Sequence, residues 1–233
     1  MPILWQAKKR KNIPHKIKME DLEKYIHNYS DKEEELLIEL DRATHHRMVA
    51  PRMISGHIQG KFLQILTATF KPKRVLEIGT FTGYSALSIA AGLSEDAVLD
   101  TFEVDDEQEE FIESFFNRSK HGRKIRLHIG SFLELAKDIQ EPYNMVFIDG
   151  DKREYPDYYR TLMGDFSGKR LVSSGTLIIA DNILWYGKVA EAARHGDRHT
   201  EALQEFNRMV LEDDRVENVI LPLRDGLNII RVK

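Results

Sequence analysis

The chain has 233 residues, of which 42% are hydrophobic and 31% are charged, and its net charge is −4. These values are typical of one folded domain, exclude disorder throughout, and argue against nucleic-acid binding through bulk charge. The chain has no cysteine, which excludes disulfides, a thiolate nucleophile and a cysteine-based zinc site, and no apolar run reaches the ~20 residues that span a bilayer.

Residues 1–18 form a basic leader that contains Lys8, Lys9, Arg10, Lys11, Lys16 and Lys18. A very short apolar patch precedes these basic residues, which is the reverse of the order in a secretory signal, so we expect a cytoplasmic protein. Two interpretations of the leader stay open: a solvated, mobile segment, or a local patch for RNA or another anionic partner.

Residues 19–70 are predicted to be helical. Ser30 or Asp31 can cap a helix over 32–47, which carries leucines on one face. A second helix is predicted to start at Ser55, with apolar residues at helical spacing, and to end before the proline that follows.

From residue 74 on, short apolar runs alternate with amphipathic stretches. The runs are RVLEIG (74–79), VLDTFEVD (98–105), KIRLHIG (124–130), NMVFIDG (144–150), GTLIIADN (175–182), VENVILPL (216–223) and GLNIIRVK (226–233). Helices are expected at 84–91, 107–117, 132–139, 158–163 and 200–211. This alternation predicts an α/β fold with a doubly wound, mostly parallel seven-stranded sheet. Only two residues separate the last two runs, so they should form an antiparallel hairpin at the sheet edge.

In an open parallel sheet, ligands bind at the carboxyl ends of the strands, so the residues that end these runs indicate the site. The first run ends with Glu77 and Gly79 and leads into a turn that differs from the GxGxxG dinucleotide pattern, and an acid there suits a positively charged ligand. The second run ends near Glu103, which can accept hydrogen bonds from both hydroxyls of a ribose or can be an exposed acid that starts a helix. After the third run, Ser131 and Phe132 could frame a flat base, and Phe132 could equally belong to the core.

The fourth and fifth runs end in oxygen ligands. Asp149 follows the fourth run, and Asp181 and Asn182 end the fifth. We expect the two strand ends to be adjacent or nearly so, which would bring three hard oxygen donors together. Such donors suit Mg²⁺ or Ca²⁺ rather than zinc. The alternative is that each acid only caps the helix that follows it.

The motifs RVLEIGTFTGYSALSIA, FIDGDKREYPDYY, LIIADNILWYGKV and DGLNIIRVK together resemble the cation-dependent O-methyltransferases that use S-adenosylmethionine. This family includes the catechol and caffeoyl-coenzyme A O-methyltransferases and bacterial relatives. The resemblance runs from about residue 53 to residue 233. It implies one Rossmann-like methyltransferase domain over 19–233, with N-terminal helices over 19–70 and a cofactor- and metal-binding core over 74–233.

The resemblance also implies roles for single residues. The positions that match cofactor-binding residues are Met53, Ser55, Glu77, Gly79, Tyr84, Ser85, Glu103, Ser131, Phe132 and Asp149. The positions that match ligands of Mg²⁺, with Mn²⁺ or Ca²⁺ as alternatives, are Asp149, Asp181 and Asn182. Lys152 matches the catalytic lysine; the alternative is a surface lysine that pairs with Asp151 or Glu154. Gly150 stands where some relatives carry a larger side chain near the adenine.

The predicted reaction methylates a hydroxyl of a catechol-like or other vicinal-dihydroxy aromatic molecule. Trp185, Tyr186 and residues 187–200 are expected to help form the acceptor pocket, with His195 and His199 as surface loop residues rather than metal ligands. Asp151 is expected to shape the turn or to tune Lys152. Three tyrosines are expected to pack rather than to take part in chemistry: Tyr155, Tyr158 and Tyr159.

The family resemblance further implies a homodimer to which the N-terminal helices contribute, and no membrane association is expected. Within the same fold, the alternative function is a tRNA methyltransferase that acts on a hydroxylated uridine, an interpretation supported by the basic leader. A nicotinamide-dependent dehydrogenase and a non-catalytic binding module are the competing classes. The turn after the first run argues against the dehydrogenase, and the intact set of predicted ligands and lysine argues against a module without activity.

Overall fold

The computed structural model describes residues 19–233, so the basic leader lies outside the described residues. Seven strands form one sheet in the order β3-β2-β1-β4-β5-β7-β6. The strands are β1 (Arg74–Ile78), β2 (Val98–Glu103), β3 (Ile125–Ile129), β4 (Tyr143–Ile148), β5 (Val172–Asp181), β6 (Val216–Leu221) and β7 (Leu227–Val232). The first five run parallel, and β7 is antiparallel to both of its neighbours. The predicted doubly wound sheet and its antiparallel hairpin are both confirmed.

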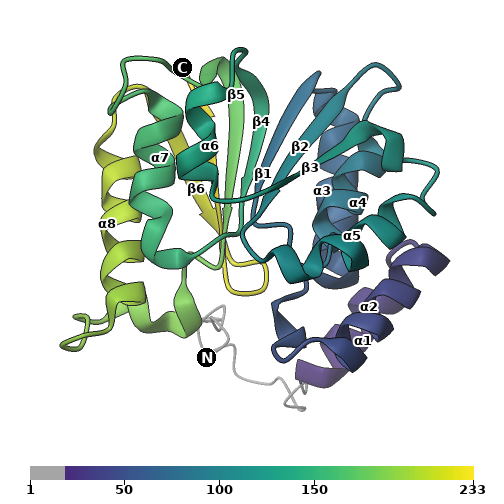
Figure 1. Cartoon of the computed structure of the whole chain (residues 1–233). Helices are drawn as coiled ribbons and strands as arrows, with labels where there is room; N and C mark the ends of the chain where they lie inside the picture. Colours follow the sequence, from purple (N-terminus) through teal and green to yellow (C-terminus); the bar gives the residue numbers. More distant parts are fainter. Residues whose placement is uncertain (1–18) are drawn as a thin grey trace, which may run out of the picture.

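The α-helices cover both faces of this sheet. They are α1 (Met19–Asn28), α2 (Glu35–Arg47), α3 (Gly56–Phe70), α4 (Tyr84–Gly92), α5 (Glu109–Phe116), α6 (Phe132–Leu135), α7 (Tyr155–Met163) and α8 (Arg198–Glu212). Short 3₁₀ turns are η1 (Pro51–Met53), η2 (Asp106–Gln108), η3 (Gly122–Lys124), η4 (Ala136–Asp138), η5 (Lys152–Glu154) and η6 (Trp185–Ala190). Figure 1 shows α3, α4 and α5 over one face and α6, α7 and α8 over the other. No helix in the described part of the chain is long and apolar enough to cross a membrane.

In the N-terminal region, the observed helix starts agree only in part with those predicted from the sequence. Ser55 directly precedes α3, as predicted. The prediction that Ser30 or Asp31 caps the next helix is wrong, because α2 begins after Glu34 and has no side-chain cap. Ser30 instead donates from its hydroxyl to the carbonyl of Ile26, which ties it to the end of α1.

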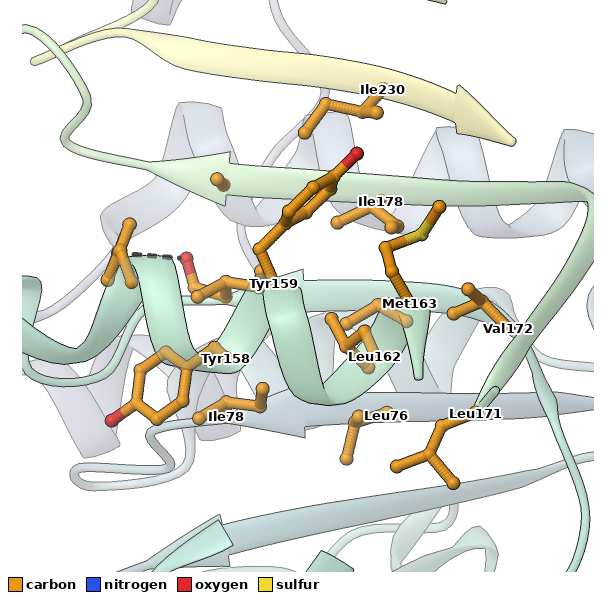
Figure 2. Close-up of a cluster of buried hydrophobic side chains, with 14 of the residues drawn as sticks. Leu76, Ile78, Tyr158, Tyr159, Leu162, Met163, Leu171, Val172, Ile178 and Ile230 are labelled. Carbon is orange, nitrogen blue, oxygen red and sulfur yellow. Dashed lines mark hydrogen bonds between the residues drawn. The ribbon is translucent and has the colours of Figure 1, made fainter. Parts of the chain in front are cut away.

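The core consists of one apolar cluster on each face of the sheet. Alternate residues of β1 divide between them: Leu76 and Ile78 pack toward α7, and Val75 packs toward α3 and α4. Figure 2 shows the first cluster, in which Leu162 and Met163 of α7 lie over the central strands. Strands buried on both faces explain why these runs are apolar almost throughout.

The register of the central strands positions the site. Ile78 in β1 pairs with Ile148 in β4, and Ile148 pairs with Ala180 in β5. Asp149 and Asp181 are the next residues after paired positions, so both emerge at the same level of the carboxyl edge. The strand order reverses between β1 and β4, and ligands in such sheets bind in the crevice at that point.

Candidate active site

A cavity of about 1000 Å³ lies at this carboxyl edge. That volume is at the upper end of the range of small-molecule and cofactor sites. Eight of the predicted site residues line the cavity: Met53, Gly79, Glu103, Phe132, Asp149, Lys152, Asp181 and Asn182. The predicted cofactor and metal positions therefore converge on one space, although they come from segments far apart in the sequence.

Gly79 allows the ends of β1 and β4 to approach closely. Its φ is +97°, and a Cβ at this position would lie 2.5 Å from the backbone oxygen of Asp149. Any side chain would therefore clash with the backbone, so only glycine fits at the end of β1.

Glu77 is buried beneath the cavity at the end of β1. Thr101 donates a hydrogen bond from its hydroxyl to Oε2 of Glu77 at 2.5 Å, while Oε1 has no partner among the described residues. Burial raises the pKa of Glu77 to about 8, against the lowering effect of Ser85 and Thr101. A positively charged ligand bound above this carboxyl would favour its ionised form.

Glu103 is held rigidly at the end of β2. Its Oε2 accepts from the backbone N–H of Phe81 at 2.7 Å, and its Oε1 accepts from that of Asp105 at 3.0 Å. The side chain is 8% exposed, so the alternative of an exposed acid is wrong, and burial raises the pKa of its carboxyl. Each carboxyl oxygen has a second lone pair, so Glu103 can still accept hydrogen bonds from a ribose.

Lys152 is the first residue of η5, the first 3₁₀ turn after β4. Its Nζ donates to Oδ1 of Asp149 and to the hydroxyl of Tyr155, each at 2.7 Å. Lys152 is 8% exposed, so the surface-lysine alternative is wrong. Asp151 accepts from the backbone N–H of Arg153 at 2.9 Å and forms an ion pair with the Arg153 side chain, which shapes the turn.

Tyr155 does more than pack. Its ring is buried, as expected, but its hydroxyl accepts a hydrogen bond from Nζ of Lys152 and can donate to the carbonyl oxygen of Ile148 at 3.1 Å or to that of Asp181 at 3.0 Å. This hydroxyl therefore joins the ends of β4 and β5 to the lysine. The sequence offered no signal for this contact beyond the three-residue spacing between Lys152 and Tyr155.

Asp181 is oriented from two sides. Its Oδ2 accepts from Nε2 of Gln59 in α3 at 2.6 Å, and its Oδ1 accepts from the backbone N–H of Asn182 at 2.7 Å. Gln59 is fully buried and stands 122 residues away in the sequence, which is why sequence reasoning missed it. Asn182 has a φ of +57°, a left-handed conformation that asparagine tolerates better than most residues.

The donors around Asp149 fit a hard divalent cation. Burial raises the pKa of the Asp149 carboxyl; Lys152 opposes this rise and the charge of Asp181 adds to it. A bound cation would relieve the repulsion between the two carboxylates, and the amide oxygen of Asn182 would complete an all-oxygen donor set. No group of three or more His, Cys, Asp or Glu side chains converges within residues 19–233, and a third donor at this site would have to be the amide of Asn182.

The other end of the cavity is aromatic. Trp185 and His199 stack with ring centroids 5.4 Å apart and planes 15° apart, and both line the cavity. His199 belongs to the first turn of α8, so the prediction of a loop residue is wrong for it, whereas His195 is exposed outside any helix or strand. Tyr186 also lines the cavity and is 73% exposed.

The turn between β6 and β7 ties the two walls of the cavity together. Arg224 donates to the carbonyl of Ile54 at 2.9 Å and to that of Ser55, while Oδ1 of Asp225 accepts from the backbone N–H of Tyr186 at 2.7 Å. Sequence reasoning gave Arg224 and Asp225 no role. The motif that contains Asp225 was the only available signal.

Five predicted cofactor residues do not line the cavity: Ser55, Glu77, Tyr84, Ser85 and Ser131. The Tyr84 hydroxyl donates instead to the carboxylate of Glu33, and Ser85 lies beside Glu77. Gly150 leaves room for Tyr158, because a Cβ there would lie 2.8 Å from the Tyr158 hydroxyl. Tyr158 itself lines the cavity close to Phe132, with ring centroids 6.1 Å apart.

Comparison with known proteins agrees with this geometry. A family model described as O-methyltransferase matches residues 27–233. The caffeoyl-CoA O-methyltransferase of Populus kitakamiensis is 32% identical, with 92% of this chain and 94% of that protein covered. The catechol O-methyltransferase of Niastella koreensis is 30% identical, with 75% and 80% covered.

Solved structures are similar over nearly the whole chain. The SAH-bound methyltransferase PaMTH1 of Podospora anserina superposes with a TM-score of 0.82 at 26% identity, with 92% of this chain and 94% of that chain covered. An O-methyltransferase of Bacillus cereus in complex with SAH superposes with a TM-score of 0.79 at 25% identity, with 91% and 97% covered.

The fold and the site thus define a Rossmann-like methyltransferase of the class that uses S-adenosylmethionine. Within that class, the chain belongs to the O-methyltransferase family.

Proposed function

We propose that this enzyme methylates one hydroxyl of a vicinal-dihydroxy aromatic small molecule, with S-adenosylmethionine as the methyl donor and a divalent cation in the site. The observation that carries the proposal is the convergence of Asp149, Asp181, Asn182 and Lys152 on one cavity. Relatives named as catechol and caffeoyl-CoA O-methyltransferases support an acceptor of this type.

The methyl donor would occupy the part of the cavity between β1 and β3. Glu103 would accept hydrogen bonds from the ribose hydroxyls, and Phe132 and Tyr158 would border the adenine. Glu77, buried beneath the cavity, would act on the positively charged methionine end through its charge, because that positive charge would favour the ionised form of the carboxyl. Met53 would cover the donor from η1.

Asp149, Asp181 and Asn182 would hold Mg²⁺, with Mn²⁺ or Ca²⁺ as alternatives. When bound, the cation would stabilise the anionic form of an acceptor that chelates it through two neighbouring oxygens. Lys152 is the base in this proposal: Asp149 and Tyr155 hold its Nζ at the cavity wall, where it can take the proton of the acceptor hydroxyl.

The transfer itself is an in-line substitution. The acceptor oxygen forms a bond to the methyl carbon as the bond from that carbon to sulfur breaks, and the electron pair of the broken bond remains on sulfur. The protein's main contribution is then to position the two reactants. The stacked pair of Trp185 and His199 offers a flat wall against which an aromatic acceptor can lie.

The metal role has a direct test. Enzyme stripped with a chelator should lose activity and regain it with Mg²⁺ or Mn²⁺. Full activity after verified removal of the metal would contradict the role.

The base role is tested with Lys152→Ala, which should lower kcat by about 10²- to 10⁴-fold. Binding of S-adenosylhomocysteine should persist, because Lys152 is not among the residues assigned to the methyl donor. Undiminished turnover in Lys152→Ala would eliminate Lys152 as the base.

The acceptor class is tested by methyl transfer from labelled S-adenosylmethionine to a catechol panel and to bulk tRNA, each with and without Mg²⁺. Metal-dependent labelling of catechols and not of tRNA is expected. The opposite result would favour the alternative, a tRNA hydroxyuridine methyltransferase, whose support is the basic leader outside the described residues. The cytoplasmic location stays a prediction, and so does the homodimer, which sedimentation of the purified chain would test.

A further inference from the structure

Two histidines meet outside the active site, where α1 approaches α3. His27 lies in the last turn of α1 and His57 in the first turn of α3. Their Nδ1 atoms are 3.3 Å apart, and their ring centroids are 5.4 Å apart. Neither side chain lines the catalytic cavity, so the proposed methyl transfer does not account for this pair.

The tautomer of His57 follows from its other nitrogen. Nε2 of His57 lies 2.7 Å from the backbone carbonyl oxygen of Asp31. A carbonyl can only accept a hydrogen bond, so Nε2 carries the proton, and in a neutral ring the lone pair is on Nδ1. The lone pair of His57 is therefore on the nitrogen that faces His27. Histidines that ligate metals usually donate their second nitrogen to a carbonyl or carboxylate in this way.

The separation of the two nitrogens is compatible with a long hydrogen bond from the Nδ1–H of His27 to Nδ1 of His57 in the metal-free protein, and also with a metal shared by both nitrogens. Most N–H donors approach their acceptors to about 2.9–3.0 Å, and the Nδ1 atoms of His27 and His57 are 3.3 Å apart. With zinc–nitrogen bonds of about 2.0–2.1 Å, that separation corresponds to an angle of about 104–111° at the metal. This range includes the tetrahedral angle that zinc prefers.

We propose that His27 and His57 form a site for a divalent transition metal, with Zn²⁺ as its expected occupant and water as the remaining ligands. Imidazole nitrogens suit zinc, copper and nickel, whereas the oxygen donors in the catalytic cavity suit magnesium. No third His, Cys, Asp or Glu joins the pair to form a metal-binding group within the described residues. With only two protein ligands, the site exchanges metal with solution rather than holding it permanently.

Metal binding would fasten α1 to the body of the enzyme. Every residue of α1 from Glu20 to Asn28 is exposed in the single chain, so packing within the chain contributes little to its position. A metal shared by His27 and His57 would replace that missing packing with two coordinate bonds. The consequence is a helix whose attachment to α3 depends on the concentration of transition metal.

The test is a Zn²⁺ titration by calorimetry on the full chain after removal of metals. The Asp181→Asn background removes a proposed ligand from the catalytic cavity, so that the histidine pair is measured separately. One equivalent of Zn²⁺ should bind, and His27→Ala or His57→Gln should weaken that binding by about tenfold or more. His46→Ala, an exposed histidine of α2, is the matched control and should bind as the background does.

Two further measurements report on the coordination of the bound metal and on the attachment of α1 to α3. Co²⁺ in place of Zn²⁺ should show a visible absorption that differs from that of the aqueous ion, and His27→Ala should lose this difference. Zn²⁺ should slow tryptic cleavage after Lys24 in α1, and should not do so in His27→Ala. Equal Zn²⁺ affinity in the histidine variants and the control would overturn the proposal, as would a Co²⁺ spectrum identical to that of the aqueous ion. A negative result for the histidine pair would not contradict the proposed metal in the catalytic cavity, because that metal is tested separately with Mg²⁺.

Discussion

The hydrogen bond from Gln59 to Asp181 leads to a quantitative prediction. Gln59→Leu removes the donor that lies 2.6 Å from Oδ2 of Asp181 and leaves that buried oxygen without a partner from α3. A hydrogen bond to a charged group contributes about 1.5–3 kcal/mol, and about 1.4 kcal/mol corresponds to tenfold in affinity. If this bond orients Asp181 toward a cation, its loss should weaken cation binding by about 10- to 100-fold.

Folding stability should change much less than cation binding. Oε1 of Gln59 is buried without a partner, and leucine removes this unfavourable atom together with the useful donor. The free energy of unfolding of the metal-free enzyme should therefore fall by only about 1 kcal/mol. A large loss of cation affinity with a small loss of stability would distinguish orientation of Asp181 from general damage to the core.

The assay is a Mn²⁺ titration of metal-free enzyme, by calorimetry or electron paramagnetic resonance, with urea unfolding in the presence of a chelator. Gln64→Leu is the matched control, because Gln64 is in the same helix and its amide oxygen accepts a hydrogen bond from Lys61 rather than one from the site. The reasoning is refuted if Gln59→Leu binds Mn²⁺ within about twofold of Gln64→Leu.

Three more predictions concern the cavity walls and the acid stability of the fold. Arg224→Met should raise the KM for S-adenosylmethionine by about tenfold and change kcat little, because the substitution removes the hydrogen bonds that hold the segment preceding α3. An unchanged KM in steady-state kinetics would contradict this prediction. Gly79→Ala should lower the free energy of unfolding by about 2 kcal/mol or more, since its Cβ would meet the backbone of Asp149, and urea denaturation that matches the wild type would disprove the clash. Arg215 lowers the pKa of Asp213 to about 2, so the stability that this 11% exposed carboxylate contributes is complete above its unfolded pKa of about 4 and is lost as the pH falls through about 2. Thermal unfolding between pH 5 and pH 2 should show Asp213→Asn losing about 1–2 kcal/mol less than the wild type over this range, and parallel curves would rule out the carboxylate as the cause.

Several features of this protein are determined by the sequence alone. Apolar runs that alternate with amphipathic stretches can bury both faces of a strand only in a sheet covered by helices, so the fold class follows from local pattern. The location of the residues that end those runs also follows from the sequence, because parallel strands place their carboxyl ends at one edge of the sheet. For that reason Asp149 and Asp181 could be placed together before any distance was known.

The partners that orient these residues were decided only by the tertiary structure. Gln59 reaches Asp181 across 122 residues, and Arg224 reaches Ile54 across 170. Such contacts depend on the angle at which a helix or a turn packs on the sheet, and packing angles leave no periodic mark in the sequence. The burial of Lys152 has the same origin: a lysine after a strand is ordinarily solvated, and only the closure of η5 and α7 over the strand end turns it toward Asp149.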